Sequence, residues 1–114
     1  MTAQVAADLR AAADVLERDG WTQGLYHRRR WFRRLHCPSG ALLRVIQPNA
    51  QDGTSLTSSN KERWYEAVWA VQDHLFAAPG PGKTLEHWND APGRTAAEVI
   101  AALRAAADRA EADL

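Results

Sequence analysis

The chain has 114 residues, of which 46% are hydrophobic and 25% charged, and its formal net charge at pH 7 is zero. These values are ordinary for a globular protein, so we expect one helical domain over residues 1–114 without a structural metal. The one cysteine, Cys37, excludes an intrachain disulfide and fits a reducing compartment. No run approaches the roughly 20 apolar residues of a membrane span and no signal-peptide core is present, so we expect a cytoplasmic protein without membrane contact.

The first predicted helix ends at Asp19. Its apolar positions recur with the spacing of one helix face: Val5, Leu9, Ala12 and Leu16. Thr2 can cap its start, and Gly20 can adopt the left-handed conformation that ends many helices. The apolar Trp21 then follows at a position that often packs back onto the last helical turn.

The arginine-rich segment of residues 23–36 fits two periodicities. A helix suits its apolar residues, Leu25, Phe32 and Leu35. A strand places four of its residues on one face: Tyr26, Arg28, Arg30 and Phe32. We favour an irregular segment or a short hairpin that enters a helix at Cys37-Pro38, because proline is favoured at the first helical position. That helix is expected to end before Pro48.

Residues 47–60 are rich in Pro, Asn, Gly, Ser and Thr, which predicts a loop. A capping box then begins at Ser59, whose side chain and that of Glu62 can each satisfy a free N–H at the helix end. The helix behind it carries two apolar stripes, made of Trp64, Val68, Val71 and Leu75 and of Tyr65, Trp69 and Phe76. Stripes this wide predict burial on more than one side, and the run AAPGPGK at 77–83 ends the helix.

Residues 84–93 are expected to form a short turn before the last helix. A second capping box, Thr95 with Glu98, predicts the start of this helix. Its apolar face consists of Val99, Leu103, Ala106 and Ala110. Because the first and last helices are rich in alanine, they can approach closely. The expected fold is therefore all-α, a compact bundle of about four main helices.

Three motifs stand out from the surrounding sequence. They are Asp19-Gly20-Trp21-Thr22-Gln23-Gly24, Cys37-x-x-Gly40-Ala41-Leu42 and Trp88-Asn89-Asp90-Ala91-Pro92-Gly93-Arg94-Thr95. Together they resemble a family of small actinobacterial and actinophage proteins classed as a domain of unknown function. The resemblance implies an intracellular, largely helical domain, and it implies no reaction, substrate or cofactor. The arginine-rich residues between Gly24 and Cys37 and the long loop after Ile46 depart from the family pattern.

The third motif contributes Trp88, Asn89, Asp90, Arg94 and Thr95 as candidate residues, and it has two interpretations. Asn and Asp favour turns because their side chains bond nearby backbone N–H groups, and Thr95 then caps the last helix. Alternatively, the free N–H groups at the helix start form a polar site for an anion, provided that Arg94 neutralises Asp90. We favour the turn.

Residues 20–50 contain six arginines and no acid, between two acidic flanks. The candidate anion-binding residues are Arg28, Arg29, Arg30, Arg33, Arg34 and Trp31. Arginine binds phosphates through its fork of donors and an indole can stack on bases, so the expected partner is nucleic acid or a phosphorylated ligand. The alternative is a solvated arm whose arginines pair with the acidic helices. The sequence pI of about 6.9 lies below the values above about 9 that are typical of nucleic-acid-binding domains.

Cys37 is a candidate nucleophile, since a helix N-terminus and neighbouring basic residues favour a thiolate. With His87 and either Asn89 or Asp90, it can complete a Cys/His/Asn constellation. However, the spacing matches no hydrolase motif, and a lone cysteine is often buried as a small hydrophobe. The histidines and the cysteine show no metal-ligand spacing, so neither a metal nor a cofactor is expected.

Three functions remain open. We expect foremost a small intracellular, non-catalytic binding or regulatory protein that binds an anionic partner. The alternatives are a small enzyme that uses Cys37 and a self-associating structural protein that forms a homo-oligomer. Exposed tryptophans mark partner surfaces, and Trp31 and Trp69 are the ones expected to be exposed.

Overall fold

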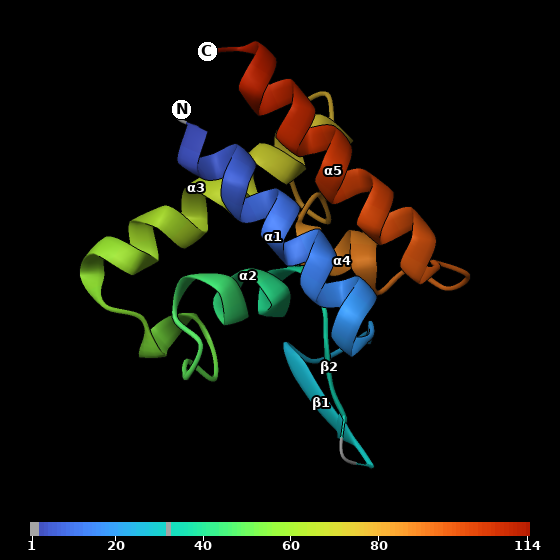
Figure 1. Cartoon of the computed structure of the whole chain (residues 1–114). Coiled ribbons are helices and arrows are strands. Elements are labelled where there is room, and N and C mark those ends of the chain that lie inside the picture. Colours follow the sequence, from blue (N-terminus) through green and yellow to red (C-terminus); the bar gives the residue numbers. More distant parts are fainter. Residues whose placement is uncertain (1–2, 32) are drawn as a thin grey trace.

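The structure, a computed structural model, describes residues 3–31 and 33–114 and is mainly helical (Figure 1). Its α-helices are α1 (Ala3–Asp19), α2 (Pro38–Ile46), α3 (Ser58–Leu75), α4 (Leu85–Asn89) and α5 (Ala96–Ala112). An antiparallel hairpin and a 3₁₀ turn complete it: β1 (His27–Arg30), β2 (Arg33–His36) and Gly53–Ser55. The helical prediction is confirmed, but the pure all-α class is not, because the hairpin adds a small sheet. The predicted cap at Thr2 and the predicted positions of Phe32 lie outside the described residues.

α1 and α5 pack side by side and make the most extensive helix contact of the described residues (Figure 1). Their apolar faces are buried as predicted, with Val5, Leu9, Ala12 and Leu16 on α1 and Val99, Leu103, Ala106 and Ala110 on α5. Small side chains at a helix contact shorten the distance between the axes. Ion pairs flank the contact: Arg10 with Asp108 and Glu111, and Arg104 with Asp14 and Glu17. The predicted packing of the first helix on the last is confirmed.

α3 is capped by Thr57, whose hydroxyl accepts a hydrogen bond from the Asn60 N–H at 3.3 Å. The predicted capping box of Ser59 and Glu62 is therefore wrong. The reason lies in the preceding loop, where the side chain of Gln47 accepts from the Thr57 N–H at 3.1 Å. This bond fixes Thr57 at the helix end and leaves the later serine inside the first turn.

One face of α3 is buried and another is exposed, which corrects the predicted burial on more than one side. Trp64 is 5% exposed, and its indole N–H donates to the Ser39 carbonyl at 3.0 Å. On the second stripe, Tyr65 and Trp69 are 41% and 56% exposed and stack on each other with ring centroids 5.5 Å apart. Trp31 is 84% exposed, so the prediction that Trp31 and Trp69 are exposed is confirmed.

The predicted turn at residues 84–93 contains the short helix α4. Thr84 caps this helix by accepting from the His87 N–H at 3.1 Å. From α3, the side chain of Gln72 accepts from the Leu85 N–H at 2.9 Å. Gln72 is the polar residue that interrupts the second apolar stripe of α3, and this bond accounts for its presence there.

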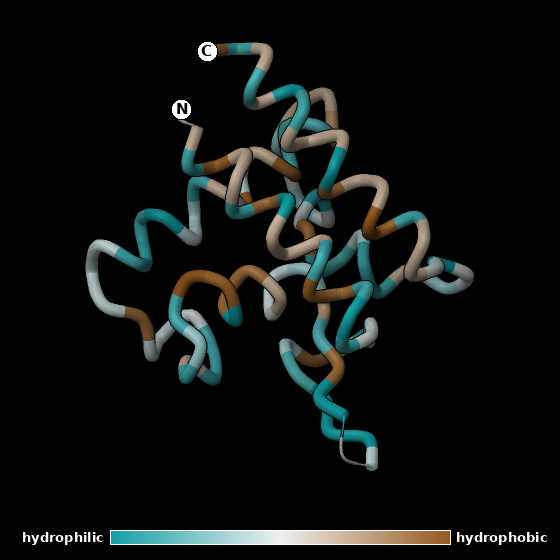
Figure 2. Tube along the Cα trace, viewed as in Figure 1, coloured by the Kyte–Doolittle hydropathy of each residue, from teal (hydrophilic) through white to brown (hydrophobic). Residues whose placement is uncertain are grey.

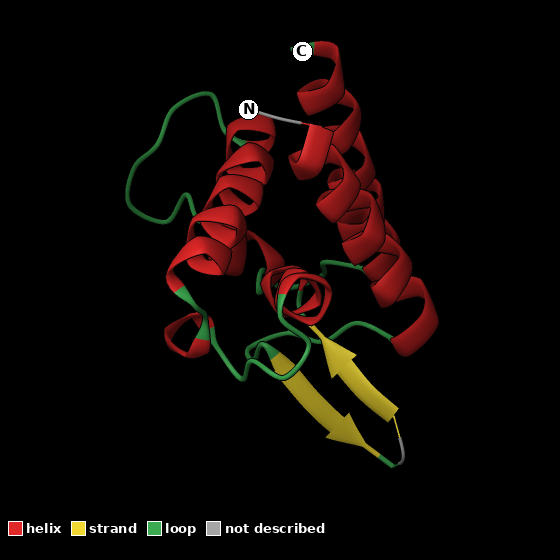
Figure 3. Cartoon of the chain, turned by 60° about the vertical axis from the view of Figure 1, so that its left-hand side comes forward, coloured by secondary structure: helices red, strands yellow, loops and turns green. Residues whose placement is uncertain are grey.

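The hairpin extends away from the helices and is hydrophilic along most of its length (Figures 2 and 3). Its register pairs His27 with His36 at the base and Arg30 with Arg33 at the far end. An isolated two-stranded hairpin is marginally stable in water. This one is held at its base, where the Thr22 N–H donates to the His36 carbonyl at 2.9 Å. Of the two conformations expected for this segment, the short hairpin is the one confirmed.

Candidate functional site

The arginines of the hairpin form the basic hairpin surface, which we define as Arg28, Arg29, Arg30, Arg33 and Arg34. All are exposed except Arg34, which is half-buried. The strand register places Arg29 opposite Arg34 and Arg30 opposite Arg33. Like charges directly opposite each other destabilise a strand pair. The arrangement therefore lowers the stability of the hairpin, and folding alone does not account for it.

Several acids of the helices are paired with arginines outside the hairpin. Ion pairs join Arg63 to Asp8, Arg94 to Glu98, Arg10 to Asp108 and Glu111, and Arg104 to Asp14 and Glu17. Over residues 3–31 and 33–114, no arginine of the basic hairpin surface forms an ion pair with a carboxylate. The alternative in which this segment neutralises the acidic helices lacks the contacts that it requires.

Trp31 lies at the tip of the hairpin, beside the arginines, and is 84% exposed. Its φ is 58°, in the left-handed region that bulky residues rarely adopt. Tight turns between strands favour Gly, Asn or Asp at such positions. A tryptophan here adds backbone strain of about 1–3 kcal/mol and gains little burial. The indole is therefore accessible to a partner, although Gly, Asn or Asp would make this turn more stable.

Two histidines face each other across the base of the hairpin. Nδ1 of His27 lies 2.8 Å from Nδ1 of His36, and Nε2 of His36 lies 3.0 Å from a carboxylate oxygen of Asp19. If Nε2–H of a neutral His36 donates to Asp19, the Nδ1 of His36 accepts a hydrogen bond from the Nδ1–H of His27. Within the part of the chain that the structure describes, Nε2 of His27 is then a buried acceptor without a hydrogen-bond partner.

Burial favours the neutral form of both histidines. For His27, burial and then the charge of Arg34 lower the pKa from 6.5 to about 4. Burial also lowers the pKa of His36, although the hydrogen bond to Asp19 opposes this shift. The pKa of Asp19 is lowered in turn, mainly by the hydrogen bond from Arg18. At neutral pH, the pair is therefore uncharged beside an ionised carboxylate.

A pocket of about 300 Å³ lies at the base of the hairpin, where α1, β2 and α2 meet. It is lined by Arg18, Asp19, Arg33, Arg34, His36 and Arg44. The sequence pointed to Arg33 and Arg34 but not to Arg18 and Arg44, because no spacing links α1 and α2 to the arginine-rich segment. Arg44 belongs to the acid-free stretch of residues 20–50, and this was the one indication that it could join the site.

The residues of the predicted Cys/His/Asn constellation are only partly brought together. Cys37, Asn89 and Asp90 line one pocket of about 380 Å³. His87 does not line it, and its backbone N–H instead bonds the cap of α4. No histidine of the described residues lies among those that line this pocket. The pocket therefore offers a thiol without the imidazole that activates such a nucleophile.

Burial also makes Cys37 a poor nucleophile. The residue is 4% exposed, and its Sγ accepts from the Gly40 N–H at 3.3 Å, which caps α2. Desolvation raises the pKa of the thiol to about 12 despite this bond. The predicted stabilisation of the thiolate is therefore wrong, because the loss of water outweighs the N–H groups of the helix start.

The motifs Asp19–Gly24 and Trp88–Thr95 are hydrogen-bonded to each other. Asn89 is fully buried between them. Its side chain accepts from the Trp21 indole N–H at 2.6 Å and donates to the Thr22 carbonyl at 3.1 Å. A buried amide with all these bonds made specifies one arrangement of the two segments.

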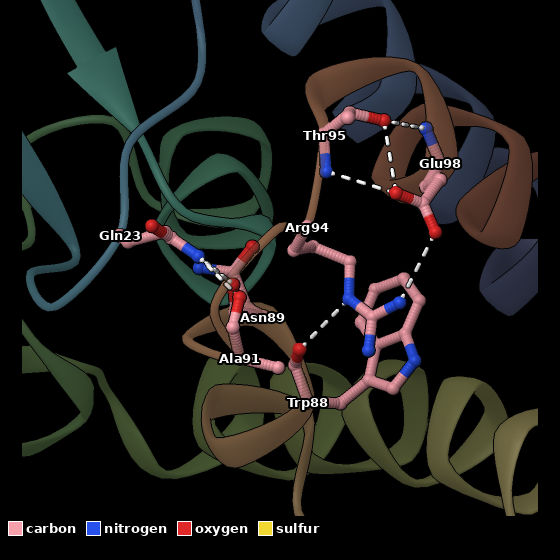
Figure 4. A network of polar contacts seen from close by, with 7 residues as sticks. All are labelled: Gln23, Trp88, Asn89, Ala91, Arg94, Thr95 and Glu98. Carbon is pink, nitrogen blue, oxygen red and sulfur yellow. Dashed lines mark hydrogen bonds and ion pairs between the residues drawn. The ribbon is translucent and has the colours of Figure 1, made fainter.

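Two further residues complete this contact. The Gln23 side chain donates to the carbonyls of Asn89 and Ala91 at 2.8 and 3.0 Å, as Figure 4 shows. The Gly24 N–H donates to the Asp90 carboxylate at 2.8 Å. The polar groups of the third motif are thus used inside the molecule, which supports its interpretation as a turn.

Arg94 and Thr95 bind within their own segment (Figure 4). The guanidinium of Arg94 lies 4.0 Å from the Trp88 ring centroid and donates to the Trp88 carbonyl at 3.0 Å and to Glu98 at 3.2 Å. Thr95 and Glu98 exchange side chain to backbone bonds at 3.2 and 3.0 Å, so this capping box is confirmed. The anion site needed Arg94 to neutralise Asp90, but Arg94 pairs with Glu98 instead.

Fold and site together define a class of protein: a mainly helical domain with a projecting basic hairpin and two polar motifs bonded to each other. The chain belongs to a family of unknown function, DUF6197, whose model matches residues 1–109. No curated protein and no solved structure matches the chain. Among the residues described, no helix has the length and apolar composition to cross a membrane, and no three His, Cys, Asp or Glu side chains gather as a metal site requires.

Proposed function

We propose that the protein is a cytoplasmic, non-catalytic binding protein whose basic hairpin surface binds nucleic acid. The observation that carries this proposal is the separation of charges. In the described parts of the chain, the arginines of the hairpin have no carboxylate partner, while five arginines outside the hairpin each form an ion pair. Arginine forks bind phosphate oxygens through two parallel bonds, and each phosphate contact releases counter-ions.

Trp31 favours single-stranded over double-stranded nucleic acid. A two-stranded ribbon can enter the major groove of a duplex, but the bases there are stacked on one another. In a single strand every base has a free face, and stacking on an aromatic side chain stabilises the complex. The exposed indole beside the arginines of the tip fits this second mode.

The test is a salt titration with a labelled single-stranded oligonucleotide. Wild type should bind at about 50 mM salt, with log affinity falling linearly with log salt concentration. The variant Arg28→Gln/Arg29→Gln/Arg30→Gln should bind more weakly, with a salt slope shallower by up to about 0.7 per lost phosphate contact. Its melting temperature should not fall, since the substitutions break no ion pair among the described residues.

A matched control removes three arginines from the helices, as Arg10→Gln/Arg104→Gln/Arg109→Gln. It has the same net charge as the hairpin variant but keeps the basic hairpin surface, so it should keep the wild-type salt slope. An equal loss of affinity in both variants would assign binding to net charge and contradict the proposal. Absence of wild-type binding at low salt would contradict it as well.

The aromatic contact is tested in the same assay. Trp31→Ala should weaken single-strand binding by about 1–3 kcal/mol, the usual effect of losing one stacked base. Trp69→Ala removes the exposed tryptophan of α3 and should leave the affinity unchanged. If Trp31→Ala binds like wild type, the preference for single strands loses its basis.

A further inference from the structure

The pocket at the base of the hairpin gathers four guanidinium groups from three elements. Arg18 is in the last turn of α1, Arg44 is in the last turn of α2, and Arg33 and Arg34 begin β2. Asp19 is the acid among the lining residues, and it already accepts a hydrogen bond from Arg18 at 2.9 Å. The pocket therefore keeps a surplus of positive charge.

Among the described residues, two of these arginines are half-buried and have no carboxylate partner. Arg34 and Arg44 are half-buried, and neither forms an ion pair within residues 3–31 and 33–114. Their charges also help to lower the pKa of both His27 and His36, so they lie close to the histidine pair. Repulsion between half-buried charges is stronger than in water because the effective dielectric constant is lower. A bound anion would relieve this repulsion.

The size and donors of the pocket select the kind of anion. A volume of about 300 Å³ is at the small end of ligand sites, enough for one phosphate group and the start of the molecule that carries it. A phosphate monoester has three free oxygens and up to two charges, whereas an internal diester has two free oxygens and one charge. Arginine forks arriving from three elements can satisfy the monoester more fully.

We propose that this pocket is a binding site for a phosphate monoester, presented either by a free phosphorylated compound or by the phosphorylated end of a nucleic-acid strand. The site goes beyond the basic hairpin surface, because Arg18 and Arg44 lie outside the hairpin. Conversely, Arg28, Arg29 and Arg30 lie outside the pocket. The two sites can therefore be tested independently.

The first experiment titrates inorganic phosphate into the full chain at constant ionic strength, followed by calorimetry and by the melting temperature. Wild type should bind, and its melting temperature should rise with phosphate concentration. Arg44→Gln should weaken binding by at least about tenfold, since it removes a charged fork of donors. Arg44→Lys keeps the charge without the fork and should bind with intermediate affinity. Both variants should fold, because the substitutions break no ion pair of the described residues.

Arg28→Gln is the matched control, because it removes one arginine of the hairpin that lies outside the pocket. It should bind phosphate like wild type. The proposal is overturned if phosphate changes neither the heat signal nor the melting temperature of wild type. It is equally overturned if Arg44→Gln and Arg28→Gln bind phosphate with the same affinity.

Two oligonucleotides, one with a 5′-phosphate and one with a 5′-hydroxyl, distinguish the sources of the ligand. A preference for the phosphorylated strand that Arg44→Gln abolishes supports the end of a nucleic acid. If wild type binds inorganic phosphate and binds both oligonucleotides with equal affinity, the result supports a free phosphorylated compound.

The same experiments separate the two proposals. If the triple variant at Arg28, Arg29 and Arg30 still binds phosphate while wild type binds neither strand, the hairpin proposal fails and the pocket stands. If wild type binds strands but not phosphate, the pocket fails and the hairpin proposal stands.

Discussion

At Cys37, a side-chain bond and a close backbone contact give the Cys-x-x-Gly motif a structural role. The thiol caps α2 through the Gly40 N–H, and the Cys37 N–H donates to the Tyr26 carbonyl at 3.1 Å. A Cβ at Gly40 would lie 1.9 Å from the same carbonyl oxygen. Because no side chain fits there, glycine is required where the chain before β1 crosses the start of α2.

The thiol of Cys37 should react slowly in the folded protein. Its pKa of about 12 leaves little thiolate, so alkylation should be much faster at about pH 9 than at about pH 6 and still rise beyond that range. Unfolding in urea should restore the pH profile of a free thiol with a pKa near about 8.5. Equal native rates at the two pH values would reveal an activated thiolate and contradict this account.

Among the elements, local capping determined which helix boundaries could be predicted. Thr95 and Glu98 are three residues apart, so their reciprocal bonds are encoded in adjacent sequence. The cap of α3 moved to Thr57 because Gln47, ten residues earlier, binds its N–H. The five residues of α4 are too few to show periodicity, and its start depends on Gln72 of α3. Local patterns in a single sequence do not reveal contacts between distant segments, so these two helix starts could not be predicted.

Removal of the cap of α5 should destabilise the fold measurably. Thr95→Ala should lower the free energy of unfolding by about 1 kcal/mol, since it leaves a helix N–H without its acceptor. Thr57→Ala should cost a similar amount at α3, and Ser59→Ala, the matched control, should change little. Urea midpoints measure all three. An unchanged midpoint for Thr95→Ala, or equal effects of Thr57→Ala and Ser59→Ala, would contradict the assigned caps.

Across the whole molecule, the formal net charge is zero, but the charges are distributed unevenly between the helices and the hairpin. Four acids of α1 and α5 pair with arginines across the contact between these two helices, while the hairpin end keeps its positive charge. Composition was enough to find the arginines of the hairpin. It could not find the pocket, because Arg18 and Arg44 come together with β2 only after α1 and α2 have packed.

The histidine pair should make the stability of the whole fold depend on pH. The pKa of His27 is lowered from 6.5 to about 4, and that of His36 is also lowered. The unfolded chain therefore binds protons first as the pH falls, so stability is complete above about pH 6.5 and is lost towards pH 4. Asp19, whose pKa is lowered from 3.8, contributes its own loss below this window.

Urea unfolding of wild type, His27→Gln and His87→Gln at several pH values tests this dependence. His27→Gln should flatten the decline between about pH 6.5 and pH 4, because the unfolded chain then has one histidine fewer to protonate. His87→Gln, at an exposed residue, is the matched control and should follow wild type. The histidine pair has no such role if all three proteins lose stability in parallel.

The pairing of α1 with α5 also sets the order in which the protein can fold during synthesis. Arg10 and Glu111, which meet across this contact, are 101 residues apart, and α5 is the last of the described elements to leave the ribosome. Until then, the apolar side of α1 has no cover from α5. Contacts this distant in sequence slow folding, because a long loop must close before they form. The two strands of the hairpin pair within residues 27–36, so we expect the hairpin to form before the helical core closes.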